Sequence, residues 1–297
     1  MEKTAIKTNT NDFYTEEVTS TKVKSKKRKG VTSKAMKSNH EKILKASSLI
    51  GFFLIWQLVS AINEKMMWFN PVFLPSPAMI VQTCIEYLQA GTLIDHIGVS
   101  FYRLIAGFAI GTVIAIVVAI IMTRSKIVDS IISPIINLFG PIPVLAFLPM
   151  FLIWFGIGEN SKITLIAYTT FIAMLPYVRD GINNTDPILI RSAVSLGASD
   201  FQVFTKVILN SALPNIFSGM KACLGLAFSS LVVAEMMGAS SGLGFIIVDS
   251  KNWFKMSDMF MAAILIGLEY TLMFAAFTGV EKILFKWKKS GIDSAIE

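Results

Sequence analysis

Long hydrophobic runs separated by shorter polar stretches dominate the pattern of this chain. Six runs carry almost no charge, and they lie at residues 46–62, 104–122, 141–155, 163–178, 216–238 and 259–280. A helix needs about 20 residues to cross the roughly 30 Å hydrocarbon core of a bilayer. A soluble protein would interrupt such runs every few positions to build amphipathic helices or strands. The pattern therefore predicts an all-α membrane protein with six transmembrane helices.

Prolines mark two irregular places between these runs. The charge-free stretch 130–158 is too long for one straight span, and it contains Pro141 and Pro143. Because proline disfavours helix at and before its position, we expect an interfacial piece up to Phe139, a break, and then a span ending near Phe155. In the link between the first two spans, the turn signal at residues 74–77 predicts a short surface helix over residues 78–89.

Composition and charge support the membrane class and suggest an orientation. Hydrophobic residues make up 54% of the chain and charged residues 16%, against about 25% charged in soluble domains. Basic residues follow the positive-inside rule if both termini are cytoplasmic. Residues 1–42, with a dense basic run at 22–29, are expected to be a disordered tail near anionic lipid, and residues 290–297 a short C-terminal tail. The basic run also fits a targeting or nucleic-acid patch, but we expect the lipid bilayer and no nucleic acid as partner.

The link between the fourth and fifth spans, residues 186–214, carries the strongest local signals. Asp186 followed by Pro187 is typical of a helix start, and Gly197 can end that helix in the left-handed conformation. Ser199 with Gln202 is a capping box that predicts a second short helix. That helix should place Phe201, Phe204 and Ile208 on one face and break at Pro214. Its apolar character for a water-facing link indicates a partner-binding surface, or packing under the bundle.

Ionisable residues inside the predicted spans are candidates for a solute pathway. Glu235 lies near one end of the fifth span and Glu269 near the middle of the sixth. Each should face a cavity or partner, because an unpaired acid in the bilayer costs about 3 kcal/mol. Glu235 fits a gate or structural hydrogen bonding equally, and Glu269 fits a buried protonated or paired side chain. The glycines after Glu235 fit a close backbone approach or a plain loop (Gly238, Gly242 and Gly244). Arg103 is expected to reach the interface.

Enzyme chemistry has no support in the sequence. No Cys/His cluster suggests a metal, and no His/Asp/Glu or Ser/His/Asp constellation falls on the predicted spans. The stretch GIGENSK at residues 156–162 lacks the Gly-Lys-Ser/Thr sequence of a phosphate loop. We therefore expect no catalytic residue, no cofactor and no metal, with any ATP bound by another chain.

The 186–214 link resembles the EAA loop of ABC importer permeases, although Arg191 stands where that family has glutamate and Asn210 where it has proline. Three further motifs occur in the order typical of the nitrate/sulfonate/taurine/bicarbonate importer subfamily. They are LPSP at residues 74–77, PIPVLAFLPMFLIWFGIGENSK at 141–162 and AEMMGASSGLGF at 234–245. Residues 46–289 thus resemble a permease of that subfamily.

The resemblance implies a type I ABC importer permease fold over residues 43–289 in the bacterial cytoplasmic membrane. It also implies a permease homodimer, separate ATP-binding ABC subunits and an extracytoplasmic solute-binding protein. The solute would be a small anion such as a sulfonate, taurine, nitrate or bicarbonate. The positions expected to face the ATPase are Arg191, Ser192, Ala193, Leu196, Gly197, Ala198 and Phe201.

Two other functions remain open on the residues alone. An ATP-independent secondary transporter or channel would carry protons on Glu235 or Glu269. A membrane-embedded enzyme is the weaker alternative, for lack of a catalytic constellation.

Overall fold

The computed structural model describes residues 43–44 and 47–285. The predicted tails at residues 1–42 and 290–297, and the basic cluster after Phe285, lie outside the described residues. Helices form nearly all of the described part, and no strand occurs in it, so the expected all-α class is confirmed. The chain divides into two units, one ending at Phe69 and one beginning at Asn70, and each is described by itself.

In the first unit, the structure describes a helix of 20 residues, Ser47–Met66. Its apolar side chains are largely exposed, including Phe52, Leu54 and Ile55, as expected of a helix that meets lipid. After the helix, the chain turns at Met67, whose φ is +52°. The turn is held by Asn63, whose side-chain oxygen accepts a hydrogen bond from the Phe69 backbone N–H at 3.2 Å.

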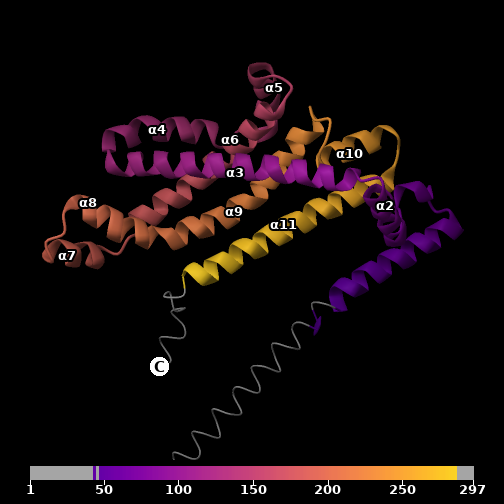
Figure 1. The fold of residues 1–297 in the computed structure, drawn as a ribbon, viewed down its shortest axis with the longest axis horizontal. Helices are drawn as coiled ribbons and strands as arrows, with labels where there is room; N and C mark the ends of the chain where they lie inside the picture. Colours follow the sequence, from indigo (N-terminus) through magenta and orange to yellow (C-terminus); the bar gives the residue numbers. More distant parts are fainter. Residues whose placement is uncertain (1–42, 45–46, 286–297) are drawn as a thin grey trace, which may run out of the picture. The chain divides into compact units, whose positions relative to one another are not determined.

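The second unit holds all the remaining helices of the described chain (Figure 1). They are η1 (Pro71–Phe73), α2 (Pro77–Gln89), α3 (Thr92–Arg124), α4 (Lys126–Phe139), α5 (Val144–Phe155), α6 (Glu159–Asn183), α7 (Pro187–Ser195), α8 (Asp200–Gln202), η2 (Val203–Ile208), α9 (Leu209–Met236), α10 (Leu243–Asn252) and α11 (Met256–Leu284). Helix α2 is the short helix expected after residues 74–77, and Ser76 caps it.

Helices α3, α6 and α11 extend beyond the predicted spans at both ends, whereas α9 ends at Met236, two residues before the predicted end of the fifth span. Helix α3 has 33 residues, whereas the predicted span at 104–122 has 19. Helix α6 has 25 residues, whereas the predicted span at 163–178 has 16. Five helices in the described chain are long and apolar enough to cross a membrane, or six if α4 and α5 count together. Those two are bent by 103° at the break expected around Pro141 and Pro143. Helix α5 alone has 12 residues, which span only about 18 Å.

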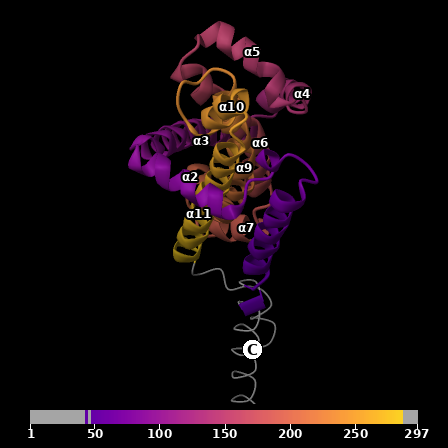
Figure 2. The ribbon, with the colours of Figure 1, turned by 90° about the vertical axis from the view of Figure 1, so that its right-hand side faces the viewer.

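Helices α3, α6 and α9 form the centre of the second unit (Figure 2), with α6 packed on both of the others. Helix α5 packs on α6 and α9 through Phe147, Leu148 and Phe151, and Figure 1 shows α4 running back along α3. Helices α3 and α6 approach each other closely at Gly111, where an added Cβ would overlap the Ala167 carbonyl oxygen. Small residues allow such approach between membrane helices, where dispersion and not the hydrophobic effect favours contact.

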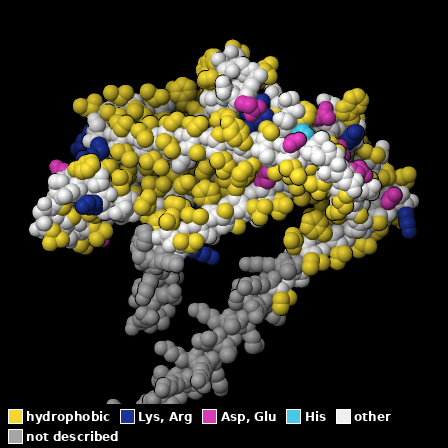
Figure 3. Space-filling view, viewed as in Figure 1, with side chains coloured by type: hydrophobic (Ala, Val, Ile, Leu, Met, Phe, Trp, Pro, Cys, Tyr) yellow, Lys and Arg dark blue, Asp and Glu magenta, His cyan; other side chains and the backbone are white. Residues whose placement is uncertain are grey.

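Hydrophobic side chains cover the length of these helices on the face shown in Figure 3, and charged side chains gather towards the ends. We call the end that carries α7 and α8 the α7 end, and the opposite end the α10 end (Figure 1). This distribution is typical of helices whose middle portions meet lipid.

The expected break at Pro214 is wrong. Residues Asp200–Met236 form one continuous 37-residue helical element, with Pro214 inside α9. Near the proline, the π-helical turn η2 loosens the backbone, and the Asn210 side-chain amide donates to the Lys206 carbonyl oxygen at 2.8 Å. Buried Ala212 and Ile216 on either side anchor the helix. Packing of the residues on either side can hold a helix together across a proline, so the helix passes through it.

Candidate functional site

The turn between α7 and α8 at the α7 end has the local structure that the sequence predicts. The Asp186 side chain accepts a hydrogen bond from the Ile188 N–H at 2.8 Å, and Gly197 has a φ of +83°. Ser199 and Gln202 form the reciprocal capping box. Because each signal acts within a few residues, the sequence alone was enough to locate them.

The second helix of this turn differs from the expectation. It is only the first turns of the long α8–η2–α9 element, not a separate short helix. Phe201 and Phe204 differ in burial: Phe201 is 72% exposed, whereas Phe204 is buried. The Arg124 guanidinium, at the end of α3, lies 4.7 Å from the centre of the Phe204 ring. This cation–π contact fixes the start of the long helix to α3.

The residues expected to face an ATPase cluster around the turn and are open to solvent in this single chain. Leu196 is 88% exposed and Phe201 72%. Arg191, Ser192 and Gly197 are also exposed, and Ala193 and Ala198 are half-buried. Helix α7 has nine residues, about 14 Å, and is too short to cross a bilayer. The turn therefore presents exposed apolar side chains on an element that is too short to cross the membrane.

Arg103 organises the α10 end, and the expectation that it reaches the interface is wrong. Its side chain is 1% exposed. Its Nε and Nη2 atoms donate to the two oxygens of Glu159, both at 2.6 Å. Its Nη1 donates to Glu235 Oε1 at 2.8 Å and to the Ser241 carbonyl oxygen at 2.6 Å. Such paired, bidentate geometry is what allows a guanidinium to be buried.

Lys162 completes a group of four charges that we call the charge cluster: Arg103, Glu159, Lys162 and Glu235. Lys162 is 4% exposed, and its ammonium lies 3.4 Å from Glu159 Oε1. Its Nζ also donates to the Gly158 carbonyl oxygen at 3.2 Å. Glu159 is the member that faces solvent, with 48% of its side chain exposed. Two positive and two negative groups balance the charge of the cluster.

Glu235 also caps helix α10, together with two side chains from α3. Its Oε2 accepts the Gly244 N–H at 2.9 Å. The Ser100 hydroxyl donates to Glu235 Oε1 at 2.7 Å and accepts the Leu243 N–H at 2.9 Å. His96 Nδ1 accepts the Gly242 N–H at 3.0 Å. The first amides of α10, which a helix leaves unpaired, are thus satisfied by other helices.

The three glycines that follow Glu235 have unequal roles. Gly242 has a φ of +119°, and a Cβ there would overlap the Glu235 carboxylate. At Gly244 a Cβ would lie 2.8 Å from the Glu235 Cβ. At Gly238 it would lie 3.3 Å from Leu152 Cδ2, so that position only requires a small residue. Of the two expectations for this run, close backbone approach applies at Gly244, where a Cβ would lie 3.0 Å from the Val232 carbonyl oxygen, whereas the close neighbour of Gly242 is a side chain.

Glu269 lies apart from the charge cluster on α11. Both of its carboxylate oxygens are buried and accept no hydrogen bond from the described residues. Among those residues, no three His, Cys, Asp or Glu side chains gather as a metal site would require.

Sequence reasoning missed His96, Ser100 and Glu159 and misjudged Arg103. A signal was available: His96, Ser100 and Arg103 are spaced i, i+4 and i+7, which places three polar side chains on one face of an otherwise apolar helix. The two carboxylate partners of Arg103 lie 56 and 132 residues further along the chain, a separation that local patterns do not connect.

The chain resembles known transport proteins over most of its length. Residues 111–289 match the family model described as "Binding-protein-dependent transport system inner membrane component". The taurine transport system permease protein TauC of Escherichia coli is 36% identical over 226 residues, which are 74% of this chain and 80% of that protein. The protein of Bacillus subtilis named as an aliphatic sulfonates transport permease, SsuC, is 34% identical over 236 residues, 80% of this chain and 84% of that one.

A solved structure supports the fold. A chain from inward-facing conformations of the MetNI methionine ABC transporter aligns with a TM-score of 0.55 and 19% identity, covering 64% of this chain and 95% of that one. This match agrees with the expected type I ABC importer permease fold. The relatives are named as transport permeases and not as enzymes, which agrees with the expectation that this chain is not an enzyme. The chain therefore belongs to the family of binding-protein-dependent transport system inner membrane components, the membrane-spanning permease subunits of ABC importers.

Proposed function

We propose that this permease conducts a small organic sulfonate such as taurine, and that a separate ATPase drives it by binding the turn between α7 and α8. The observation that carries the coupling proposal is the exposed apolar pair Leu196 and Phe201, which flank the capped turn at Gly197. Exposed apolar surface on a rigid, non-spanning element is typical of a protein interface. The basic side chains at the α7 end support a cytoplasmic location for this end under the positive-inside rule.

Several side chains in the turn would complete the ATPase contact. Arg191 and Ser192 project from α7, and Ala193, Gly197 and Ala198 leave room for a partner backbone. Because Arg191 replaces a glutamate of the EAA loop, we expect a carboxylate or carbonyl on the ATPase to meet it.

The α10 end would form the extracytoplasmic closure of the solute pathway. Glu235, Gly242 and Gly244 hold the α9–α10 connection against α3, and Gly238 packs on α5. A solute-binding protein would deliver the solute at this end. Glu269, whose carboxylate has no partner among the described residues, would face the pathway or a second copy of the permease in a homodimer.

Co-purification tests the coupling proposal directly. We expect Leu196→Asp to insert normally but to lose the ATPase subunit, because a charge would be buried at an apolar interface. The matched control is Leu196→Met, which keeps the apolar volume and should retain the ATPase. Retention by Leu196→Asp at the wild-type level would refute the proposed contact.

Uptake of radiolabelled taurine tests the solute. Cells that express the transporter should take up taurine, and other alkylsulfonates should compete with it. Nitrate or bicarbonate as the effective competitor would assign a different anion to the pathway.

A secondary transporter is the alternative, and the unpaired carboxyl of Glu269 favours it. In that case uptake would persist without ATP, follow a proton gradient, and be abolished in Glu269→Gln. Uptake that stops on ATP depletion while the proton gradient is maintained would exclude this alternative.

A further inference from the structure

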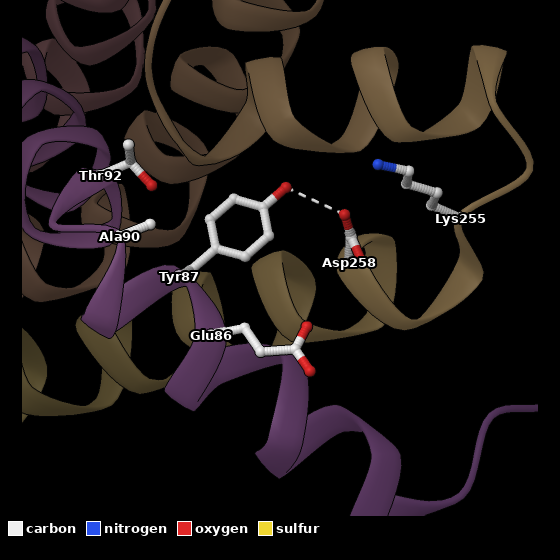
Figure 4. Close-up of a pocket in the computed structure, with 6 residues that line it drawn as sticks. All are labelled: Glu86, Tyr87, Ala90, Thr92, Lys255 and Asp258. Carbon is white, nitrogen blue, oxygen red and sulfur yellow. Dashed lines mark hydrogen bonds between the residues drawn. The ribbon is translucent and has the colours of Figure 1, made fainter.

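A pocket at the α10 end lies apart from the charge cluster, where the last turn of α2 meets the start of α11 (Figure 4). It has a volume of about 390 Å³ and is lined by Glu86, Tyr87, Ala90, Thr92, Lys255 and Asp258. The Tyr87 hydroxyl donates to Asp258 Oδ2 at 2.9 Å across the pocket. Figure 4 shows Lys255 and Glu86 on either side of this hydrogen bond.

The pocket carries both signs of charge in fixed places. Asp258 is 8% exposed. Burial, and then the hydrogen bond to Asp258, raise the pKa of Tyr87 to about 12, so its hydroxyl keeps its proton at physiological pH. Lys255 and Glu86 are exposed, and Lys255 makes no ion pair within the described part of the chain. A complementary ligand needs an oxyanion for Lys255 and an ammonium for the two carboxylates.

The α10–α11 turn beside the pocket exposes two aromatic side chains in a strained backbone. Trp253 is 71% exposed and Phe254 65%. The Lys255 N–H donates to the Ser250 carbonyl oxygen at 2.9 Å, and the Phe254 N–H to that of Lys251 at 3.2 Å. This helix ending normally places glycine where Phe254 stands, and the φ of Phe254 is +56°. A bulky residue in this region costs about 1–2 kcal/mol, so its aromatic ring should contact something outside the chain.

The position of the turn indicates a lipid as that contact. It directly precedes α11, an apolar helix of 29 residues, whose length of about 43 Å exceeds the roughly 30 Å hydrocarbon core. The start of α11 therefore reaches the headgroup region. Exposed Trp and Phe with flanking lysines are typical of residues at that depth, and Lys251 and Lys255 flank the aromatic pair.

We infer that this pocket binds the headgroup of a zwitterionic phospholipid of the phosphatidylethanolamine type. Lys255 binds the phosphate, Glu86 and Asp258 face the ammonium, and Trp253 and Phe254 lie at the boundary with the acyl chains. The volume accommodates a small headgroup, at the lower end of the range for ligand pockets. The site is independent of the transported solute and of the ATPase.

Lipid titration by native mass spectrometry tests the inference on the full chain purified in mild detergent. The wild-type protein should retain phosphatidylethanolamine in preference to phosphatidylglycerol, which lacks the ammonium. We expect Lys255→Gln and Glu86→Gln each to weaken phosphatidylethanolamine binding about tenfold, the effect of losing one charge-assisted hydrogen bond. Lys251→Gln is the matched control, because it removes the same charge from the last turn of α10, outside the pocket lining, and it should bind as the wild type does.

Three results would overturn the inference. The first is equal retention of the two lipids by the wild type, and the second is unchanged phosphatidylethanolamine binding in both pocket variants. The third concerns free taurine, which carries an ammonium and an oxyanion without acyl chains. Taurine binding that depends on Lys255, with no preference for phosphatidylethanolamine, would assign the pocket to a soluble zwitterion. Lipid retention is measured without transport, so its failure leaves the proposed function untouched.

Discussion

Two arginine–carboxylate pairs have the same length but lie at opposite ends of the second unit. At the α10 end, Arg103 lies 2.6 Å from Glu159, and at the α7 end Arg179 lies 2.6 Å from Asp129. Arg103 is 1% exposed and holds a second, fully buried carboxylate, whereas the side chains of the other pair are 29% and 36% exposed. Burial, not distance, decides what such a pair contributes, because water screens the exposed one.

A related contrast separates the charge cluster from the turn at Gly197. The charge cluster, with His96 and Ser100, satisfies its polar groups within the chain, down to the first amides of α10. The turn at Gly197 instead exposes apolar side chains. A site whose interactions are complete is suited to hold a shape, and a site with exposed apolar surface is suited to bind a partner.

The largest expected effect is that of Arg103→Met. Removing the guanidinium leaves Glu235 buried without its charge partner, which should destabilise the fold by about 3–5 kcal/mol. The control is Arg179→Met, which should lose less than about 1 kcal/mol because its pair is partly exposed. Unfolding in detergent, followed by circular dichroism, measures both. Equal losses would show that burial does not separate the two pairs.

A pair of glycine substitutions gives a smaller and more local comparison. Both Gly242 and Gly197 have positive φ, but only at Gly242 would a Cβ meet another residue, the Glu235 carboxylate. We expect Gly197→Ala to destabilise by about 1 kcal/mol, from backbone strain alone. Gly242→Ala should lose about 3 kcal/mol, since it adds a clash to a conformation that only glycine adopts readily. The same unfolding measurement applies, and a larger loss at Gly197 would contradict the contrast between the ends.

The smallest expected effect concerns Tyr87, a half-buried group at the α10 end. Tyr87→Phe should lose about 1 kcal/mol, the value of one hydrogen bond. The folded pKa of about 12 lies above the usual 10 of tyrosine. The stability that the protonated Tyr87 hydroxyl contributes to the fold is therefore complete below pH 10, and it is lost as the pH rises from 10 towards 12. Thermal unfolding across this range should show the loss in the wild type and not in Tyr87→Phe. Parallel curves would mean that Tyr87 does not titrate in this way.

Sequence reasoning succeeded where a few neighbouring residues decide the structure. The cap at Asp186, the left-handed Gly197 and the capping box at Ser199 and Gln202 were all predictable. It failed at Pro214, because packing of the buried residues Ala212 and Ile216 supports a helix that proline alone would interrupt. Intrinsic preference is a weak guide when tertiary contacts oppose it.

The charge cluster was beyond local reasoning for a different physical reason. Arg103, Glu159 and Glu235 are each unremarkable as single charges near the ends of apolar runs. Only the packing of α3 against α6 and α9 brings them together. Their mutual neutralisation is a property of the tertiary fold, and it explains how a side chain expected at the interface is almost completely buried.

The unbroken helix through Pro214 has a mechanical consequence. Thirty-seven residues make a rod of about 55 Å, with the exposed turn near one tip and Glu235 near the other. A tilt of about ten degrees applied at the first tip would swing the second by roughly 10 Å, if the rod stays rigid. In the proposed coupling, a movement of the turn between α7 and α8 would therefore be transmitted along this helix to the hydrogen bonds of Glu235 at the other end.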